Sequence, residues 1–227
     1  MPDKRREVSG KMTKEECRKR ISEVGIIPVV RASSAKQAMQ AAEAVCAAGI
    51  SIVEITMTVP GAVEVIAQLT KSNSSGILIG AGTVLDVESA RRCVDAGAEF
   101  LLSPGFDRGV VEFANARGKL MIAGALTPTE VYTAWKAGSD LIKVFPCGNV
   151  GGAKYIKALK APLPQIPLVP TGGVNLETAA DFIRAGAEAL GIGGELVSPA
   201  ALNSGNLQEI TETGKKYLAI VRQARQK

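Results

Sequence analysis

The sequence predicts an α/β protein that consists of a single-domain (β/α)8 TIM barrel. Short apolar runs of strand composition occur eight times and alternate with longer segments of helical periodicity. The distance along the chain from the start of one run to the start of the next leaves room for a strand, a loop, a helix and a second loop, and is too long for hairpins. The length of 227 residues lies at the short end for such a barrel. Eight βα units favour a closed barrel over an open doubly wound sheet.

The eight strand candidates are rich in Val, Ile and Leu, which is typical of parallel strands buried on both faces. Aromatic residues make up only 4% of the chain and hydrophobic residues 46%, so the core must be built mainly from aliphatic side chains. The strand candidates comprise residues 26–31, 51–56, 77–80, 100–103, 120–123, 141–145, 168–171 and 189–192.

Helix signals occur between the strand candidates. Four segments have amphipathic periodicity, begin near a capping residue or proline and end beside a glycine, at residues 35–48, 87–96, 129–137 and 177–185. We expect a further helix, at residues 14–24, to plug the bottom of the barrel. Residues 1–13 are expected to form a flexible lead-in, and residues 14–227 the barrel itself.

Composition excludes several classes of function. The formal net charge of +5 is concentrated at the two ends, and no basic stripe with interleaved aromatic residues indicates nucleic-acid binding. No apolar run approaches the roughly 20 residues of a membrane helix, and the polar N-terminus does not resemble a secretory signal. We therefore expect a soluble, cytoplasmic protein whose partner is a small molecule rather than a nucleic acid or a membrane.

Histidine is absent, and the four cysteines lack C-x-x-C spacing. The missing histidine excludes His-based catalytic triads and the commonest metal ligand. The cysteine spacing indicates neither a zinc site nor a disulfide framework. We expect no metal and no cofactor, so acid–base chemistry must fall to Glu, Asp, Lys, Tyr, Cys or water.

Two charged residues interrupt apolar strand candidates. Active sites of such barrels lie at the carboxyl ends of the strands, and Lys143 in LIKVF and Glu54 in VEIT occur there. Burial lowers the pKa of a lysine, which makes its amine a nucleophile toward carbonyls, and raises that of a glutamate, which suits proton transfer. The structural alternative for Lys143 is an amine that reaches solvent at the strand end or pairs with a carboxylate, and for Glu54 an ion pair with Lys143 or Arg31.

Glycine pairs follow the last two strand candidates. Gly172 and Gly173 lie in TGGV, and Gly193 and Gly194 end GIGG. Barrels frequently bind phosphate at this place through main-chain N–H groups, and glycine lets the backbone approach the anion. The alternative is that these are ordinary glycines of βα turns.

Six motifs occur in one order along the chain and together are specific. They resemble the 2-keto-3-deoxy-6-phosphogluconate (KDPG) aldolase family, also described as 4-hydroxy-2-oxoglutarate aldolases, from about residue 26 to residue 197. The motifs are EIT with TVP (residues 54–60), GAGTVL (80–85), SPG (103–105), TPTE (127–130), KVFP (143–146) and PTGGVN (170–175).

The resemblance implies a metal-free class I aldolase, usually a homotrimer, that cleaves KDPG to pyruvate and glyceraldehyde 3-phosphate. It also implies activity on 4-hydroxy-2-oxoglutarate, which gives pyruvate and glyoxylate, and a place in Entner–Doudoroff carbohydrate metabolism. Lys143 would form the Schiff base with the C2 carbonyl, and Glu54 would move protons. Thr83 matches the threonine at the pyruvate carboxylate, and Arg31 a substrate-side arginine. The phosphate loops match Gly172, Gly173, Gly193 and Gly194.

Three positions bear on the substrate. Thr58 stands where many members carry an arginine for the carboxylate, and we assign it to substrate binding. Gly194, followed by Glu195, stands where a serine often contacts the phosphate. Thr171 matches the gluconate-type enzymes, whereas galactonate-type relatives tend to have valine there.

Three other interpretations remain open at this point. An aldolase could act on a 2-keto-3-deoxy acid of other configuration or without phosphate. A phosphate-binding barrel isomerase or epimerase would share the glycine loops but would not need a Schiff-base lysine. A binding or assembly module without turnover would bury Lys143 and Glu54 at a cost to stability and with no use for them.

Overall fold

The computed structural model describes residues 12–72 and 76–226. Most of the expected lead-in, residues 1–13, therefore lies outside the described residues. Its last residue, Thr13, is the N-cap of helix α1 (Lys14–Val24), where its hydroxyl and the side chain of Glu16 form a capping box.

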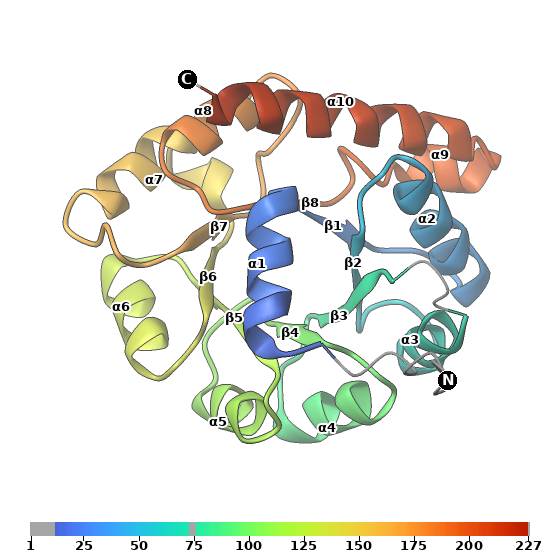
Figure 1. The fold of residues 1–227 in the computed structure, drawn as a ribbon, viewed down its shortest axis with the longest axis horizontal. Coiled ribbons are helices and arrows are strands. Elements are labelled where there is room, and N and C mark those ends of the chain that lie inside the picture. Colours follow the sequence, from blue (N-terminus) through green and yellow to red (C-terminus); the bar gives the residue numbers. More distant parts are fainter. Residues whose placement is uncertain (1–11, 73–75, 227) are drawn as a thin grey trace, which may run out of the picture.

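Eight parallel strands form the sheet that the sequence predicts. Their order is β7-β6-β5-β4-β3-β2-β1-β8, and the parallel bridges Leu168–Ala187 and Thr171–Gly191 join the two ends. The (β/α)8 barrel is thereby confirmed (Figure 1). The strands are β1 (Ile26–Val30), β2 (Ile52–Thr56), β3 (Leu78–Gly82), β4 (Phe100–Leu102), β5 (Leu120–Ala125), β6 (Leu141–Val144), β7 (Leu168–Pro170) and β8 (Leu190–Ile192).

Helices surround the barrel, and the four predicted in the sequence are confirmed with shifted ends (Figure 1). The largest shift is at α8, because the side chain of Asn175 accepts the N–H groups of Glu177 and Thr178 and holds these residues in a turn. The helices after α1 are α2 (Ala35–Ala47), α3 (Ala62–Lys71), α4 (Val87–Asp95), α5 (Arg108–Ala116), α6 (Pro128–Lys136), the 3-10 turn η1 (Cys147–Val150), α7 (Ala153–Lys160), α8 (Ala179–Arg184), α9 (Pro199–Ser204) and α10 (Leu207–Arg225).

Side chains of each strand alternate between two cores, as the period of two requires. Those that point outward pack under the helices. Those that point inward form a separate cluster in which Cys17 and Ile21 of α1 contact the first inward residues of the strands, such as Ile52 and Leu141. Helix α1 lies across this end of the barrel (Figure 1), and the predicted plug is confirmed.

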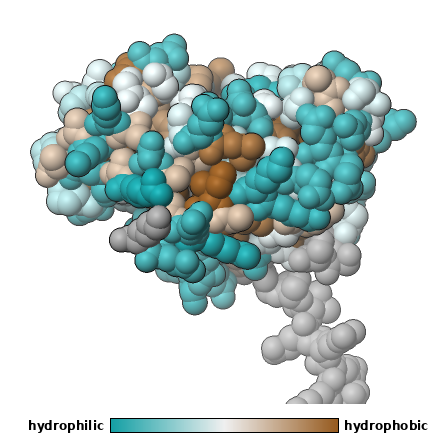
Figure 2. Space-filling model, turned by 90° about the horizontal axis from the view of Figure 1, so that it is seen from above, coloured by the Kyte–Doolittle hydropathy of each residue, from teal (hydrophilic) through white to brown (hydrophobic). Residues whose placement is uncertain are grey.

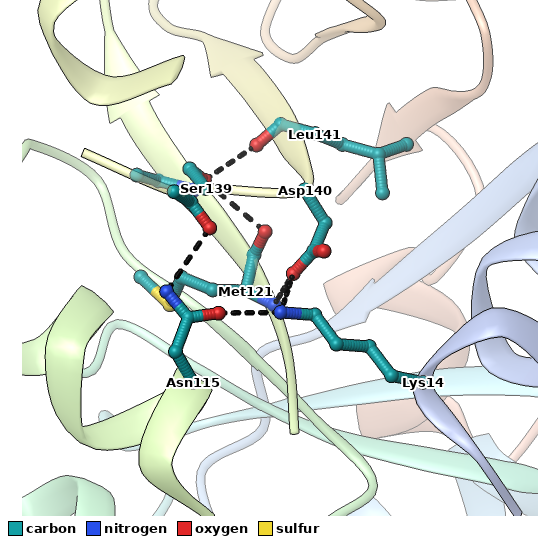
Figure 3. Close-up of polar contacts among 8 residues, drawn as sticks. Lys14, Asn115, Met121, Ser139, Asp140 and Leu141 are labelled. Atoms are coloured by element: carbon teal, nitrogen blue, oxygen red, sulfur yellow. Dashed lines mark hydrogen bonds and ion pairs between the residues drawn. The ribbon is translucent and has the colours of Figure 1, made fainter. Parts of the chain in front are cut away.

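A polar network fastens α1 to the strands (Figure 3). Lys14 Nζ forms an ion pair with Asp140 Oδ2 at 3.0 Å and donates a hydrogen bond to Asn115 Oδ1. The same Asp140 oxygen accepts the N–H of Met121 at 2.8 Å. Because the side chains of the two partners are only 22% and 16% exposed, we expect this contact to contribute to stability.

Replacing Lys14 with alanine should lower the free energy of unfolding by about 1–2 kcal/mol, because Asp140 loses a charged partner in a half-buried place. Urea denaturation measures the change. Lys19→Ala is the matched control, since Lys19 pairs with Glu23 on the exposed face of the same helix. We expect this control to stay within about 0.5 kcal/mol. Equal losses in both variants would contradict the assigned role of Lys14.

The side of the molecule that carries α10 is mostly hydrophilic. Figure 2 shows polar and charged side chains over most of this side, with a small hydrophobic area near its middle. The apolar residues of α10, among them Ile210, Tyr217 and Val221, are buried against the barrel. No helix in the described residues is both long and apolar enough to cross a membrane.

Candidate active site

Glu54 and Lys143 point into the barrel from opposite sides. Glu54 follows the inward residue Ile52 by two positions on β2, and Lys143 follows Leu141 by two on β6. In the closed ring, β2 and β6 are separated by three strands in either direction. The two side chains are 0% and 2% exposed, respectively. They therefore occupy the layer directly above the apolar plug of the barrel.

Burial drives both groups toward their neutral forms. It raises the pKa of Glu54, against the opposing effect of the positive charges of Lys143 and Arg31. It lowers the pKa of Lys143, an effect that Glu54 opposes and Arg31 supports. A lysine of lowered pKa has more of the neutral amine that attacks carbonyls, and a glutamic acid of raised pKa can give and take protons near neutral pH.

Glu54 has no fixed partner. Neither of its carboxyl oxygens has a hydrogen-bond partner among the described residues, and it forms no ion pair there. The structural alternative, an ion pair with Lys143 or Arg31, is therefore not formed. A buried carboxyl group without a hydrogen-bond partner lowers the stability of the protein. A substrate that binds beside Glu54 would supply the missing partner.

Glycines on the neighbouring strands make room for the side chain of Glu54 and for the main chain at Pro104. A Cβ atom on Gly82 of β3 would lie 1.7 Å from Glu54 Oε1. Gly124 of β5 pairs in register with Lys143, and a Cβ there would lie 2.1 Å from the carbonyl carbon of Pro104. Neither glycine has a positive φ, so the requirement is space and not backbone conformation.

Phe145 lies beside Lys143 and lines two cavities, which neither Lys143 nor Glu54 lines. Its ring centroid lies 5.0 Å from Lys143 Nζ, and the side chain lines both cavities. The proline pocket, of about 360 Å³, is also lined by Pro104, Gly105, Phe106, Gly124, Ala125, Leu126 and Glu130. The glycine pocket, of about 200 Å³, is also lined by Arg31, Thr171, Gly172, Gly173, Val174, Gly191, Gly193, Gly194 and Glu195.

The glycine pocket brings together the predicted phosphate loops. Gly172 and Gly173 have φ values of 85° and 76°, and a Cβ on Gly173 would lie 2.6 Å from the Cα of Gly148. The main-chain N–H groups of Gly173 and Gly194 donate to no acceptor within the part of the chain that the structure describes. Free N–H groups beside the guanidinium group of Arg31 suit a bound anion.

The two predicted carboxylate-binding threonines lie at the ends of β2 and β3. Thr83 has a φ of 58°, which is strained for a β-branched residue and is typical of functional sites. The hydroxyl of Thr58 lies 2.7 Å from that of Thr56, which contacts the carbonyl of Val30. Neither Thr58 nor Thr83 lines the two cavities.

The sequence does not single out three residues of this site, Gly82, Gly124 and Phe145, as functional. The signal that could have found them is the period of two along each strand. Phe145 follows Lys143 by two positions, and Gly124 follows the inward residue Ile122 by two.

Outside the barrel mouth, a cavity of about 620 Å³ lies beside α7 and α8. Of the predicted residues, it is lined only by Gly173. Within residues 12–72 and 76–226, no cluster of three or more His, Cys, Asp or Glu side chains could hold a metal ion.

Sequence relatives of this chain are aldolases. The 2-dehydro-3-deoxy-phosphogluconate aldolase of Treponema pallidum is 34% identical over 202 residues, which cover 88% of this chain and 95% of that protein. The KHG/KDPG aldolase of Escherichia coli K12 is 31% identical over 192 residues, which cover 84% and 89%.

Solved structures of similar fold include that of a KDPG aldolase. A native KDPGal structure superposes with a TM-score of 0.82 at 30% identity and covers 89% of this chain and 96% of that one. KDPG aldolase from Legionella pneumophila, with pyruvate captured as a covalent carbinolamine intermediate, superposes with a TM-score of 0.81 at 28% identity over 88% and 96% of the two chains. The model of the KDPG and KHG aldolases matches residues 17–213, so the chain belongs to the KDPG and KHG aldolase family.

Proposed function

We propose that this protein is a class I aldolase that cleaves KDPG to pyruvate and glyceraldehyde 3-phosphate, and 4-hydroxy-2-oxoglutarate to pyruvate and glyoxylate. The observation that carries the proposal is the buried pair of Lys143 and Glu54, which face each other in the barrel without an ion pair. The names of the relatives support the choice of substrates.

Lys143 is proposed as the nucleophile. Its neutral amine attacks the C2 carbonyl of the 2-keto acid and forms a carbinolamine, which loses water to give a protonated imine. The imine then accepts the electron pair of the breaking C3–C4 bond. An enamine forms in place of a bare carbanion, and this change lowers the barrier to cleavage.

Glu54 is proposed to move the protons. As a carboxylate it takes the proton of the C4 hydroxyl while the C3–C4 bond breaks and the aldehyde leaves. The resulting carboxyl group can protonate the enamine at C3, after which water hydrolyses the imine and releases pyruvate. The lack of fixed partners leaves both oxygens of Glu54 free to contact successive intermediates.

The remaining predicted residues are proposed to bind the substrate. Thr83 and Thr58 would hold the carboxylate of the keto acid, and Thr171 a hydroxyl group of gluconate configuration. The glycine pocket would take the distal end of the substrate, with Arg31 as its positive charge. Phosphate would be bound by the N–H groups of Gly172, Gly173, Gly193 and Gly194.

We further propose that the protein works in the cytoplasm as a homotrimer, without cofactor, in the Entner–Doudoroff route. Exposed apolar side chains such as Leu85 and Tyr132, which are 61% and 45% exposed, are candidates for contacts between subunits. Sedimentation analysis of the purified protein would test the assembly.

Incubation with pyruvate and borohydride tests the chemistry directly. We expect the intact mass to rise by one reduced pyruvyl group, because borohydride reduces the imine irreversibly, and peptide mapping should place the adduct on Lys143. The isomerase or epimerase alternative predicts no adduct. Folded protein that gains no mass would therefore refute the aldolase and leave the glycine pocket as the only indication of function.

A further inference from the structure

The positive charge of the glycine pocket comes from Arg31. A Cβ on Gly193 would lie 2.9 Å from Arg31 Nη1, so the guanidinium group lies directly against the loop after β8. Arg31 forms no hydrogen bond or ion pair within the described residues. Its charge is therefore available to an anionic group that enters the pocket.

A negative charge lines the same pocket. Glu195 is exposed there and has no ion-pair or hydrogen-bond partner in the described part of the chain. Burial raises the pKa of Tyr217 from α10, and the carboxylate of Glu195 adds to this effect. Glu195 therefore adds a negative charge to the pocket to which Arg31 contributes a positive one.

The fold does not require a glycine at position 194. Gly172 and Gly173 have positive φ values, and a side chain on Gly193 would press against Arg31. A Cβ on Gly194 would meet only Pro199 Cδ, at an ordinary 3.7 Å, and its φ lies outside the left-handed region. A residue with a hydrogen-bond donor in its side chain would therefore fit at position 194, and the glycine there supplies none.

We propose that Glu195, next to Gly194, is a specificity-determining residue that weakens the preference for a phosphorylated distal end. A phosphate monoester carries about −1.5 to −2 charges at neutral pH, so a carboxylate in the same pocket opposes it. An uncharged hydroxyl end does not meet this repulsion. Specificity is a difference of affinities, and the enzyme should therefore accept unphosphorylated 2-keto-3-deoxy acids beside phosphorylated ones. This inference rests on the proposed aldolase function.

Cleavage of KDPG and of unphosphorylated 2-keto-3-deoxygluconate by Glu195→Gln tests the proposal. We expect kcat/KM for KDPG to rise about tenfold, mainly through a lower KM, because one like charge leaves a partly exposed pocket. The value for the unphosphorylated acid should stay within about twofold. Gly194→Ser adds a hydroxyl donor and keeps the charge of Glu195. It should also raise the ratio of kcat/KM for KDPG to kcat/KM for the unphosphorylated acid.

Glu177→Gln is the matched control, because Glu177 is exposed on the neighbouring loop but does not line the pocket. It removes the same charge and should change neither substrate. The inference is overturned if Glu195→Gln leaves the ratio of the two substrates at its original value, or if Glu177→Gln shifts the ratio equally. If the unaltered enzyme cleaves neither KDPG nor the unphosphorylated acid, the proposed function is refuted, and this inference with it.

Discussion

Lys143→Ala should abolish cleavage, with a loss of at least about 10⁴-fold in kcat, because the enamine cannot form without the amine. The variant should also gain no mass from pyruvate and borohydride. Lys143 is 2% exposed on the inner face of β6, and no other lysine in the described residues lies on the inward face of a strand. Intact mass and a pyruvate-release assay measure the two effects.

The control for folding is Lys143→Met, which keeps most of the side-chain volume. Burial lowers the pKa of Lys143, so the folded state binds its proton less tightly than the unfolded state does. This difference costs stability below the unfolded pKa of about 10.4. The methionine variant should therefore be at least as stable as the original protein at neutral pH. Lys157→Met, at an exposed position of α7, should keep full trapping; normal turnover by Lys143→Met would disprove the assignment.

Glu54→Gln should still form the imine with pyruvate but cleave substrate about 10²–10⁴-fold more slowly, the usual contribution of a general acid–base group. The amide has nearly the shape of the carboxyl group and cannot accept the proton of the C4 hydroxyl. Single-turnover cleavage compared with borohydride trapping separates the two steps. A slowdown of less than about tenfold would count against Glu54 as the proton carrier.

The same variant should change stability in a pH-dependent way. Burial raises the pKa of Glu54 in the folded state, above the unfolded value of about 4.3. Below that value both states are protonated, and the amide brings no advantage. As the pH rises further, ionisation favours the unfolded state, and Glu54→Gln should become the more stable protein. Urea denaturation of both proteins at pH 4 and pH 8 measures this change in their relative stability.

Much of the fold could be predicted from the sequence, because strands buried on both faces leave continuous apolar runs. Lys143 and Glu54 were found for the same reason, since a charge in such a run is anomalous. Gly82 and Phe145 give no such signal, because glycine and phenylalanine are ordinary in buried strands. Their importance arises from neighbours that only the closed barrel brings together.

Local hydrogen bonds account for the other differences. Thr127, the first residue of the TPTE motif, is the N-cap of α6, where its hydroxyl accepts the N–H of Glu130. The positive φ of Thr83 could not be predicted either, since that conformation is usual for glycine. Such features depend on backbone geometry that residue type alone does not determine.

The fastening of α1 and α10 at the closed end of the barrel has a practical consequence. Arg225, near the end of α10, donates hydrogen bonds to the carbonyls of Glu23 and Glu188, which lie at the amino ends of β1 and β8. Both ends of the described chain are thus anchored away from the mouth that holds Lys143. A carrier protein or solid support linked through the C-terminus would leave the entrance unobstructed, so the enzyme is suited to immobilisation through that end.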